Sequence, residues 1–273
     1  MDDFWLRVIA SFLVGGVWLM SVSVIAERFG SRSGGIIGGL PSTVFIALFF
    51  IALNQGPDFA VQATIVTPAA FIINSYFLLL LAVNSDRGYL KTMSLAGIFW
   101  LIAMGALVLF HLDSWTISLS IWLAGLTVLC WLIAKRISLR NHELPRVRFT
   151  TAQLMGRSLF AGLIIASAVI ISKYAGEIVG GIFAAFPAMY LSTFTILYFA
   201  QGPKFTRATS APLMISGGIN TVVYCIAIYY LYPRFGIYTG TLMAYLISLA
   251  SAYFVVRNLI AHLHAEERDS ATM

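Results

Sequence analysis

Long apolar runs separated by short polar segments extend over nearly the whole chain. A bilayer core about 30 Å thick needs roughly 20 apolar residues per helix. Nine runs lack Asp, Glu, Lys and Arg, and eight of them have 19 residues or more. The shorter one lies between Arg157 and Lys173, whose long side chains can snorkel to the interface. We predict an all-α polytopic membrane protein with nine transmembrane helices. The runs comprise residues 8–26, 33–57, 59–85, 92–112, 114–134, 158–172, 178–203, 208–233 and 235–256.

Composition excludes other classes of protein. Of the 273 residues, 60% are hydrophobic and 10% are charged, whereas a soluble domain carries about 25% charged residues. The net charge of +6 comes from Lys and Arg in short segments between apolar runs, which is typical of cytoplasmic membrane loops and not of a nucleic-acid-binding surface. We therefore expect the lipid bilayer, and no nucleic acid, as a partner. The sequence is also compatible with a homodimer.

The basic residues predict the orientation of the chain. With nine crossings and an external N-terminus, 14 Lys and Arg fall on the cytoplasmic side and 3 on the external side. Cytoplasmic loops carry an excess of Lys and Arg, so we predict an external N-terminus and a cytoplasmic C-terminus. The first run follows Asp2 and Asp3, an acidic start unlike that of a signal peptide, and we therefore treat it as a retained helix.

The chain contains an internal repeat. A shift of 146 positions gives 11 identities between residues 30–75 and 176–221 without a gap. The identities include Gly, Pro, Gln and Asn, which chance similarity between apolar runs rarely aligns. Because an odd number of helices separates equivalent positions, the second copy is inserted in the opposite sense. Accordingly, Asp58 of an external loop corresponds to Lys204 of a cytoplasmic one.

This repeat predicts an inverted 4+1+4 arrangement of helices. Inverted repeats are common in secondary transporters, whose sites lie near the midplane at the repeat interface. A fused duplication that transports nothing would give the same pattern. The predicted segments are a first four-helix repeat at 1–113, a linker helix with a basic cytoplasmic loop at 114–153, a second repeat at 154–260 and a cytoplasmic tail at 261–273.

The second half also resembles a known family. Residues 174–187 read Tyr-Ala-Gly-Glu-Ile-Val-Gly-Gly-Ile-Phe-Ala-Ala-Phe-Pro, and an Arg/Thr/Ser stretch follows at residues 206–210. This pattern is similar to the Gly-rich segment ending in Phe-Pro of GlpM-type small inner-membrane proteins and of the related DUF3147 group, which have about four spans. In the first half, Leu40 replaces the Phe before the Pro. The resemblance implies a fused, inverted duplication in a bacterial inner membrane, and it implies no particular activity.

Ionisable groups are absent from the apolar runs. All 11 acidic residues lie outside them, and the four His and two Cys are scattered. An intramembrane carboxylate is the usual proton or cation relay, and metalloenzymes need clustered ligands. Neither a nucleophile–base pair nor a phosphate-binding Gly-Lys motif is present. We therefore predict no enzymatic activity, no metal site and no cofactor.

Neutral polar residues inside the helices are the first candidates for solute contacts. Asn74 and Asn220 lie deep in the third and eighth runs, and each precedes a hydroxyl residue, Ser75 or Thr221. An unpaired amide in hydrocarbon costs several kcal/mol. The two asparagines are therefore expected either to meet across the pseudo-twofold axis or line a solute path, or to fasten helices through hydrogen bonds worth about 1 kcal/mol.

Pro41 and Pro187 are the second candidates. Each follows a Gly-rich stretch and lacks a backbone donor, which predicts a weak or broken helix at matched positions. Interrupted helices at corresponding positions of two halves indicate a transporter site. The alternative is a kink that lets helices pack closely through small residues. Hydroxyl groups expected near these breaks belong to Ser42, Thr43, Ser192 and Thr193.

These patterns predict a transporter or channel for a small uncharged, zwitterionic or anionic solute. Its path is expected between the second and third runs on one side and the seventh and eighth runs on the other. The alternative is a membrane scaffold or bilayer-sensing protein that transports nothing. A crevice that reaches Asn74 or Asn220 favours transport, whereas packed side chains that seal both residues favour the scaffold.

Overall fold

The computed structural model describes residues 3–38, 40–136 and 149–271, and these residues form helices joined by short links. Most of the predicted basic loop, residues 137–148, and Gly39 of the first Gly-rich stretch lie outside the described residues. The elements are α1 (Asp3–Gly38), α2 (Ser42–Gln55), α3 (Pro57–Ile65), α4 (Thr67–Val83), the 3₁₀ helix η1 (Ser85–Arg87), α5 (Tyr89–Leu109), α6 (Trp115–Arg136), α7 (Thr151–Ala184), α8 (Ala188–Gln201) and α9 (Pro203–Ala271).

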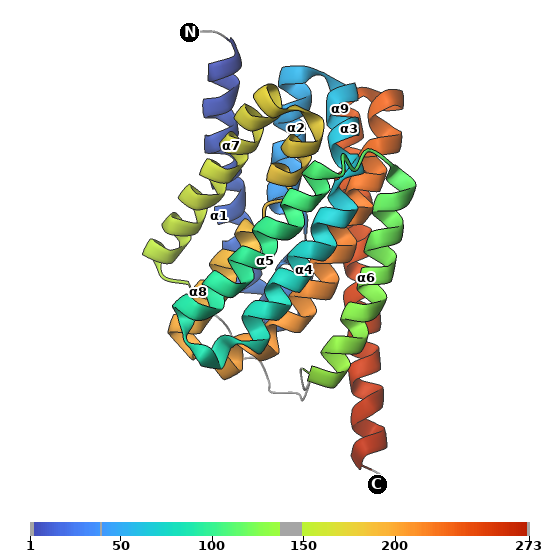
Figure 1. Cartoon of the computed structure of the whole chain (residues 1–273). Helices are drawn as coiled ribbons and strands as arrows, with labels where there is room; N and C mark the ends of the chain where they lie inside the picture. Colours follow the sequence, from blue (N-terminus) through green and yellow to red (C-terminus); the bar gives the residue numbers. More distant parts are fainter. Residues whose placement is uncertain (1–2, 39, 137–148, 272–273) are drawn as a thin grey trace.

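The helices form an elongated bundle whose two termini lie at opposite ends (Figure 1). In the described part of the chain, five helices are long and apolar enough to cross a membrane. The consecutive helices α3 and α4 meet at 49° and make a sixth span if they are counted together. The predicted class, an all-helical protein with several membrane-type helices, agrees with this architecture.

Two of the long helices reverse direction at a glycine. Gly176 in α7 and Gly236 in α9 have non-helical backbones with φ of 83° and 70°, which only glycine adopts readily. The Tyr232 and Thr241 hydroxyls lie 2.7 Å apart across the second reversal, and Ser248 Oγ donates to the Asn220 carbonyl at 2.9 Å. The two parts of α9 therefore pack side by side as a helical hairpin (Figure 1).

The helices α2 and α8 have the same boundaries after the shift of 146 positions. A proline precedes each helix, Pro41 with φ −74° and ψ 54° and Pro187 with φ −77° and ψ 44°. A glycine in the positive-φ region ends each one, Gly56 at 96° and Gly202 at 83°, and a proline then begins the next helix. The identical residues of the two segments thus adopt the same backbone conformations.

Small residues allow α1 and α7 to pack closely. A Cβ atom at Gly162 would lie 2.6 Å from the Phe12 carbonyl oxygen, and one at Gly16 would lie 3.1 Å from the Ser158 carbonyl oxygen. Ser158 Oγ also donates to the Gly16 carbonyl at 2.6 Å. Lipid tails are as apolar as the side chains, so helices in a membrane gain no hydrophobic free energy when they associate. Close backbone contact of this kind is then a principal source of the attraction between them.

Candidate functional site

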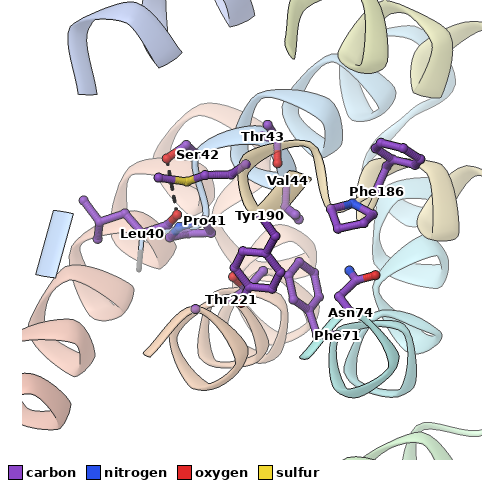
Figure 2. Close-up of a pocket in the computed structure, with 13 residues that line it drawn as sticks. Leu40, Pro41, Ser42, Thr43, Val44, Phe71, Asn74, Phe186, Tyr190 and Thr221 are labelled. Atoms are coloured by element: carbon purple, nitrogen blue, oxygen red, sulfur yellow. Dashed lines mark hydrogen bonds between the residues drawn. The ribbon is translucent and has the colours of Figure 1, made fainter. Parts of the chain in front are cut away.

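The chain has a break at Pro41, before α2, and a matched break at Pro187, before α8. These two breaks, called the first and the second break, meet at a single cavity (Figure 2). Residues 40–44 approach it from the first break, and residues 186–190 approach it from the second, while α4 and α9 complete the lining. Its volume of about 30 Å³ accommodates about two water molecules. No lining residue carries a formal charge. The lining comprises Leu40, Pro41, Ser42, Thr43, Val44, Phe71, Asn74, Phe186, Pro187, Met189, Tyr190, Gly217 and Thr221.

Asn74 of α4 satisfies a backbone group that the second break releases. Pro187 has no N–H, and α7 ends at Ala184, so the Ala185 carbonyl lies outside the regular helical hydrogen bonding. Asn74 Nδ2 donates to this carbonyl at 2.6 Å, and the Asn74 side chain is fully buried. The asparagine therefore connects α4 to the break in the other half of the chain.

A tryptophan holds the other end of the Asn74 amide. Trp100 Nε1 of α5 donates to Asn74 Oδ1 at 2.8 Å. The Trp100 ring also packs edge-on against Phe186, with ring centroids 5.2 Å apart. Asn74 thus joins α4, α5 and the segment between α7 and α8, and both partners fix the orientation of its amide.

The α9 side of the cavity combines hydroxyl groups with glycine. The buried Tyr190 hydroxyl of α8 donates to the Leu213 carbonyl at 3.2 Å, and Ser75 Oγ donates to the Met214 carbonyl at 3.2 Å. A Cβ atom at Gly217 would overlap the Tyr190 hydroxyl. Glycine at this position therefore gives the tyrosine access to the surface of α9.

Asn220 does not contribute to the cavity. It is fully buried, its Nδ2 donates to Ser216 Oγ at 3.0 Å, and its Oδ1 accepts from Ser251 Oγ at 3.1 Å. These contacts join the two parts of the α9 hairpin. In the described contacts, Asn74 and Asn220 have different partners and fasten different pairs of segments.

The structure brings together six of the ten predicted site residues. These six line the cavity and come from both halves: Pro41, Ser42, Thr43, Asn74, Pro187 and Thr221. Ser75 lies directly behind the lining and bonds α4 to α9, whereas Ser192 donates to the Met189 carbonyl at 3.2 Å within its own helix. Thr193 is half-buried in α8, and neither it nor Ser192 is part of the lining.

Sequence reasoning missed Trp100, Phe186 and Tyr190. Trp100 was the easiest of the three to predict. It lies in the middle of the apolar run 92–112, whereas tryptophan is usually found near the membrane–water interface. A buried indole N–H needs an acceptor, and this requirement indicates a polar partner at the same depth. The approach of Tyr190 to Gly217 depends on how α8 crosses α9, for which the sequence contains no local signal.

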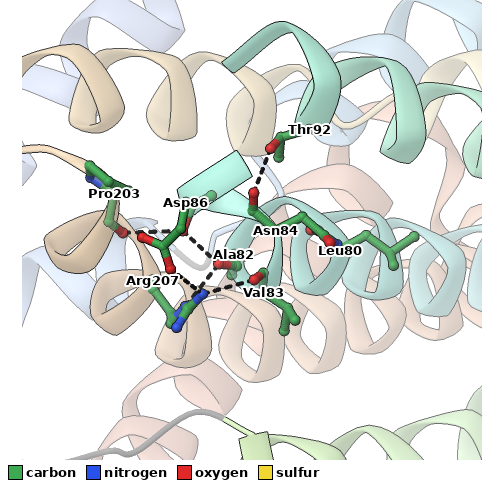
Figure 3. A network of polar contacts seen from close by, with 9 residues as sticks. Leu80, Ala82, Val83, Asn84, Asp86, Thr92, Pro203 and Arg207 are labelled. Atoms are coloured by element: carbon green, nitrogen blue, oxygen red, sulfur yellow. Dashed lines mark hydrogen bonds and ion pairs between the residues drawn. The ribbon is translucent and has the colours of Figure 1, made fainter. Parts of the chain in front are cut away.

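A second polar cluster joins the halves at one end of the bundle (Figure 3). Arg207 of α9 donates to the Ala82 and Val83 carbonyls at 3.0 and 2.8 Å and pairs with Asp86 at 2.9 Å. It therefore caps the C-terminal carbonyl groups of α4. The matched position in the first half is Val61, so this cap has no counterpart there.

The fold and the cavity define a helical protein of membrane type with a small uncharged cavity between two interrupted segments. Residues 154–261 match the family model "Protein of unknown function (DUF3147)", the group whose Gly-rich segment this part of the chain resembles. No curated protein and no solved structure matches the chain. The relation to GlpM-type proteins stays a prediction.

Proposed function

We propose that the chain crosses the membrane nine times as two inverted four-helix repeats joined by α6, with an external N-terminus and a cytoplasmic C-terminus in an inner membrane. The reversals at Gly176 and Gly236 support this count, because each divides a long helix into two apolar segments. The matched boundaries and caps of α2 and α8 support the duplication. The 14 to 3 distribution of basic residues supports the orientation.

We further propose that this protein is a transporter or channel for a small uncharged, zwitterionic or anionic solute. The convergence of the two matched helix breaks on one cavity carries this proposal. Backbone groups released at breaks are tolerated at membrane depth where they are buried in protein or line a cavity. Broken helices at corresponding positions also form the sites of many secondary transporters.

The size of the cavity indicates how a solute would pass. A chamber of about 30 Å³ holds water-sized groups, so a larger solute requires the two halves to separate. The Asn74–Ala185 hydrogen bond lies on this interface and must break or exchange partners when α4 moves relative to the second break. The state described here is therefore the closed member of the proposed cycle.

One observation favours the alternative scaffold function. Asn74 and Asn220 are both fully buried, and the described contacts of each use both ends of the amide. A scaffold needs only such interhelical fastening. The two functions predict different permeabilities of the membrane, since a scaffold leaves the solute permeability equal to that of the lipid alone.

The inverted topology is tested by labelling matched positions. In a background with Cys130→Ser and Cys225→Ala, single Asp58→Cys and Lys204→Cys variants place a thiol in the two equivalent turns. A membrane-impermeant maleimide added to intact cells should label Asp58→Cys and spare Lys204→Cys until the cells are opened. Labelling of both variants from the same side would contradict the inverted repeat.

Permeability is tested by osmotic swelling of proteoliposomes with glycerol, glycine and formate, which represent the three solute classes. At least one solute should enter faster than into protein-free vesicles. The double variant Thr43→Val and Thr221→Val removes two cavity hydroxyls at nearly constant volume and should slow this entry. The matched control is Thr127→Val on the exposed face of α6, which should leave it unchanged. Equal permeability of all vesicles would favour the scaffold.

A further inference from the structure

Arg157 is the one charged residue among the described buried residues of the chain, with 5% of its surface exposed. The sequence predicted that its side chain would snorkel to the interface from the end of a short apolar run. The structure differs, because the guanidinium carbon lies 4.8 Å from the centroid of the Phe149 ring, and this ring helps to cover it. Phe149 directly precedes Thr150, the N-cap of α7, so the guanidinium points toward the first turn of the helix.

Among the described residues, the Arg157 guanidinium has no acidic partner and no hydrogen-bond acceptor, and its Nε is a buried donor without a partner. Other cations of the described chain differ. Arg207 has an aspartate and two carbonyls, Arg7 donates to the Leu53 carbonyl, and Lys173 is exposed and lies over the Phe4 ring. A buried charge that lacks a partner is strongly destabilising.

The first turn of α7 adds hydrogen-bond donors without intrahelical acceptors near this unpaired charge. A capping box between Thr150 and Gln153 satisfies the Gln153 N–H, while the N–H groups of Thr151 and Ala152 have no intrahelical acceptor. The N-terminus of a helix carries a partial positive charge. A guanidinium and a helix N-terminus of the same sign therefore lie close together, and an anion would compensate both.

We propose that Arg157 and the first turn of α7 form a binding site for an oxyanion, a phosphate or carboxylate group. The group belongs either to a dissolved anion or to the headgroup of an anionic lipid, since both present the oxygens that a guanidinium contacts in pairs. Phe149 is only half-buried and is the residue that must move for the anion to enter. This site is distinct from the neutral cavity and does not depend on solute transport.

The test compares thermal unfolding midpoints of the full chain and of Arg157→Gln. In neutral detergent, inorganic phosphate is compared with chloride at equal ionic strength. Phosphate at about ten times its dissociation constant should raise the wild-type midpoint by about 3 °C and leave Arg157→Gln unchanged. Without phosphate, Arg157→Gln should unfold at the same or a higher temperature than the wild type, because it removes a buried unpaired charge. A purely structural arginine predicts the opposite order.

A second experiment, in lipid nanodiscs, identifies whether the anion is a dissolved ion or a lipid headgroup. Nanodiscs of phosphatidylcholine alone are compared with nanodiscs that also contain phosphatidylglycerol. A rise with phosphatidylglycerol that Arg157→Gln abolishes, without a response to dissolved phosphate, assigns the site to a lipid headgroup. Lys173→Gln removes an exposed cation of the same helix and should keep the wild-type response.

The proposal is overturned if neither phosphate nor phosphatidylglycerol raises the wild-type midpoint, or if Arg157→Gln or Lys173→Gln gives the opposite of the expected response. If Arg157→Gln does not fold, Arg157→Lys replaces it. An ammonium contacts an oxyanion as a point charge, so the phosphate shift of Arg157→Lys should be less than half that of the wild type. An equal or larger shift overturns the proposal as well.

Discussion

The helix α4 and residues 213–229 of α9 occupy matched positions of the repeat, and each carries an asparagine at the same place. Asn74 binds the carbonyl released at the second break and the indole of another helix, whereas Asn220 binds two serines of its own helical hairpin. The matched segments therefore share the polar residue, but the described partners of that residue differ. This difference makes the cavity asymmetric.

The largest effect is expected for Asn74→Leu. The variant leaves the Ala185 carbonyl and the Trp100 N–H buried without partners, and each such group costs about 1–3 kcal/mol. We expect a loss of about 3 kcal/mol. In Asn220→Leu the serine partners can rotate toward carbonyls of their own helix, so we expect a loss of about 1 kcal/mol. Thermal unfolding in detergent measures both, and a larger loss in Asn220→Leu would contradict the contrast.

The next effect concerns Gly217, one turn before Asn220. Gly217→Ala places a methyl group against the Tyr190 hydroxyl, and the displaced tyrosine loses its bond to the Leu213 carbonyl. Overpacking of this kind costs typically about 2 kcal/mol. The control is Gly97→Ala in α5, where nothing lies within 4 Å of the new Cβ atom and the higher helix propensity of alanine should stabilise. Equal unfolding midpoints of the two variants would show that Tyr190 does not depend on this glycine.

A smaller effect distinguishes two tryptophans. Trp100→Phe keeps an aromatic ring against Phe186 but removes the donor to Asn74, and should destabilise by about 1 kcal/mol. Trp122→Phe removes an indole N–H that is buried without a partner, and should be neutral or stabilising. The two unfolding midpoints should therefore shift differently, and a greater loss in Trp122→Phe would contradict the assigned role of Trp100.

The helical class and the broken segments were predictable because their signals are local. Charge-free runs mark apolar helices, Pro41 and Pro187 mark the breaks, and the repeat places both breaks at matched positions. The partners of Asn74 were not predictable, because they depend on how α5 and the second break pack against α4. A repeat alignment indicates that two asparagines correspond, yet it contains no information on which neighbours each one contacts.

The burial of Arg157 shows the same limit. Its place next to a short apolar run favoured snorkelling, since the sequence gives the length of the side chain and the distance to the end of the run. The covering by Phe149 depends on the path of the chain just before α7. The sequence therefore shows that Arg157 borders an apolar run, but it does not show that a neighbouring aromatic ring covers the side chain.

The smallest effect tests the asymmetric cap of α4. Asp86 is largely exposed, with 56% of its side-chain surface accessible, so Asp86→Asn should cost at most about 0.5 kcal/mol, and high salt should reduce this loss. Arg207→Gln removes the ion pair with Asp86 and also the donors to the Ala82 and Val83 carbonyls. It should cost about 1 kcal/mol, of which only the ion-pair part depends on salt. Unfolding midpoints at low and high salt separate the two contributions. If the two variants proved equally harmful, the ion pair, which both remove, and not the capping of α4 would hold the halves together at this end. The asymmetry at this end of the bundle would then lie in surface charge and not in the hydrogen bonds that cap α4.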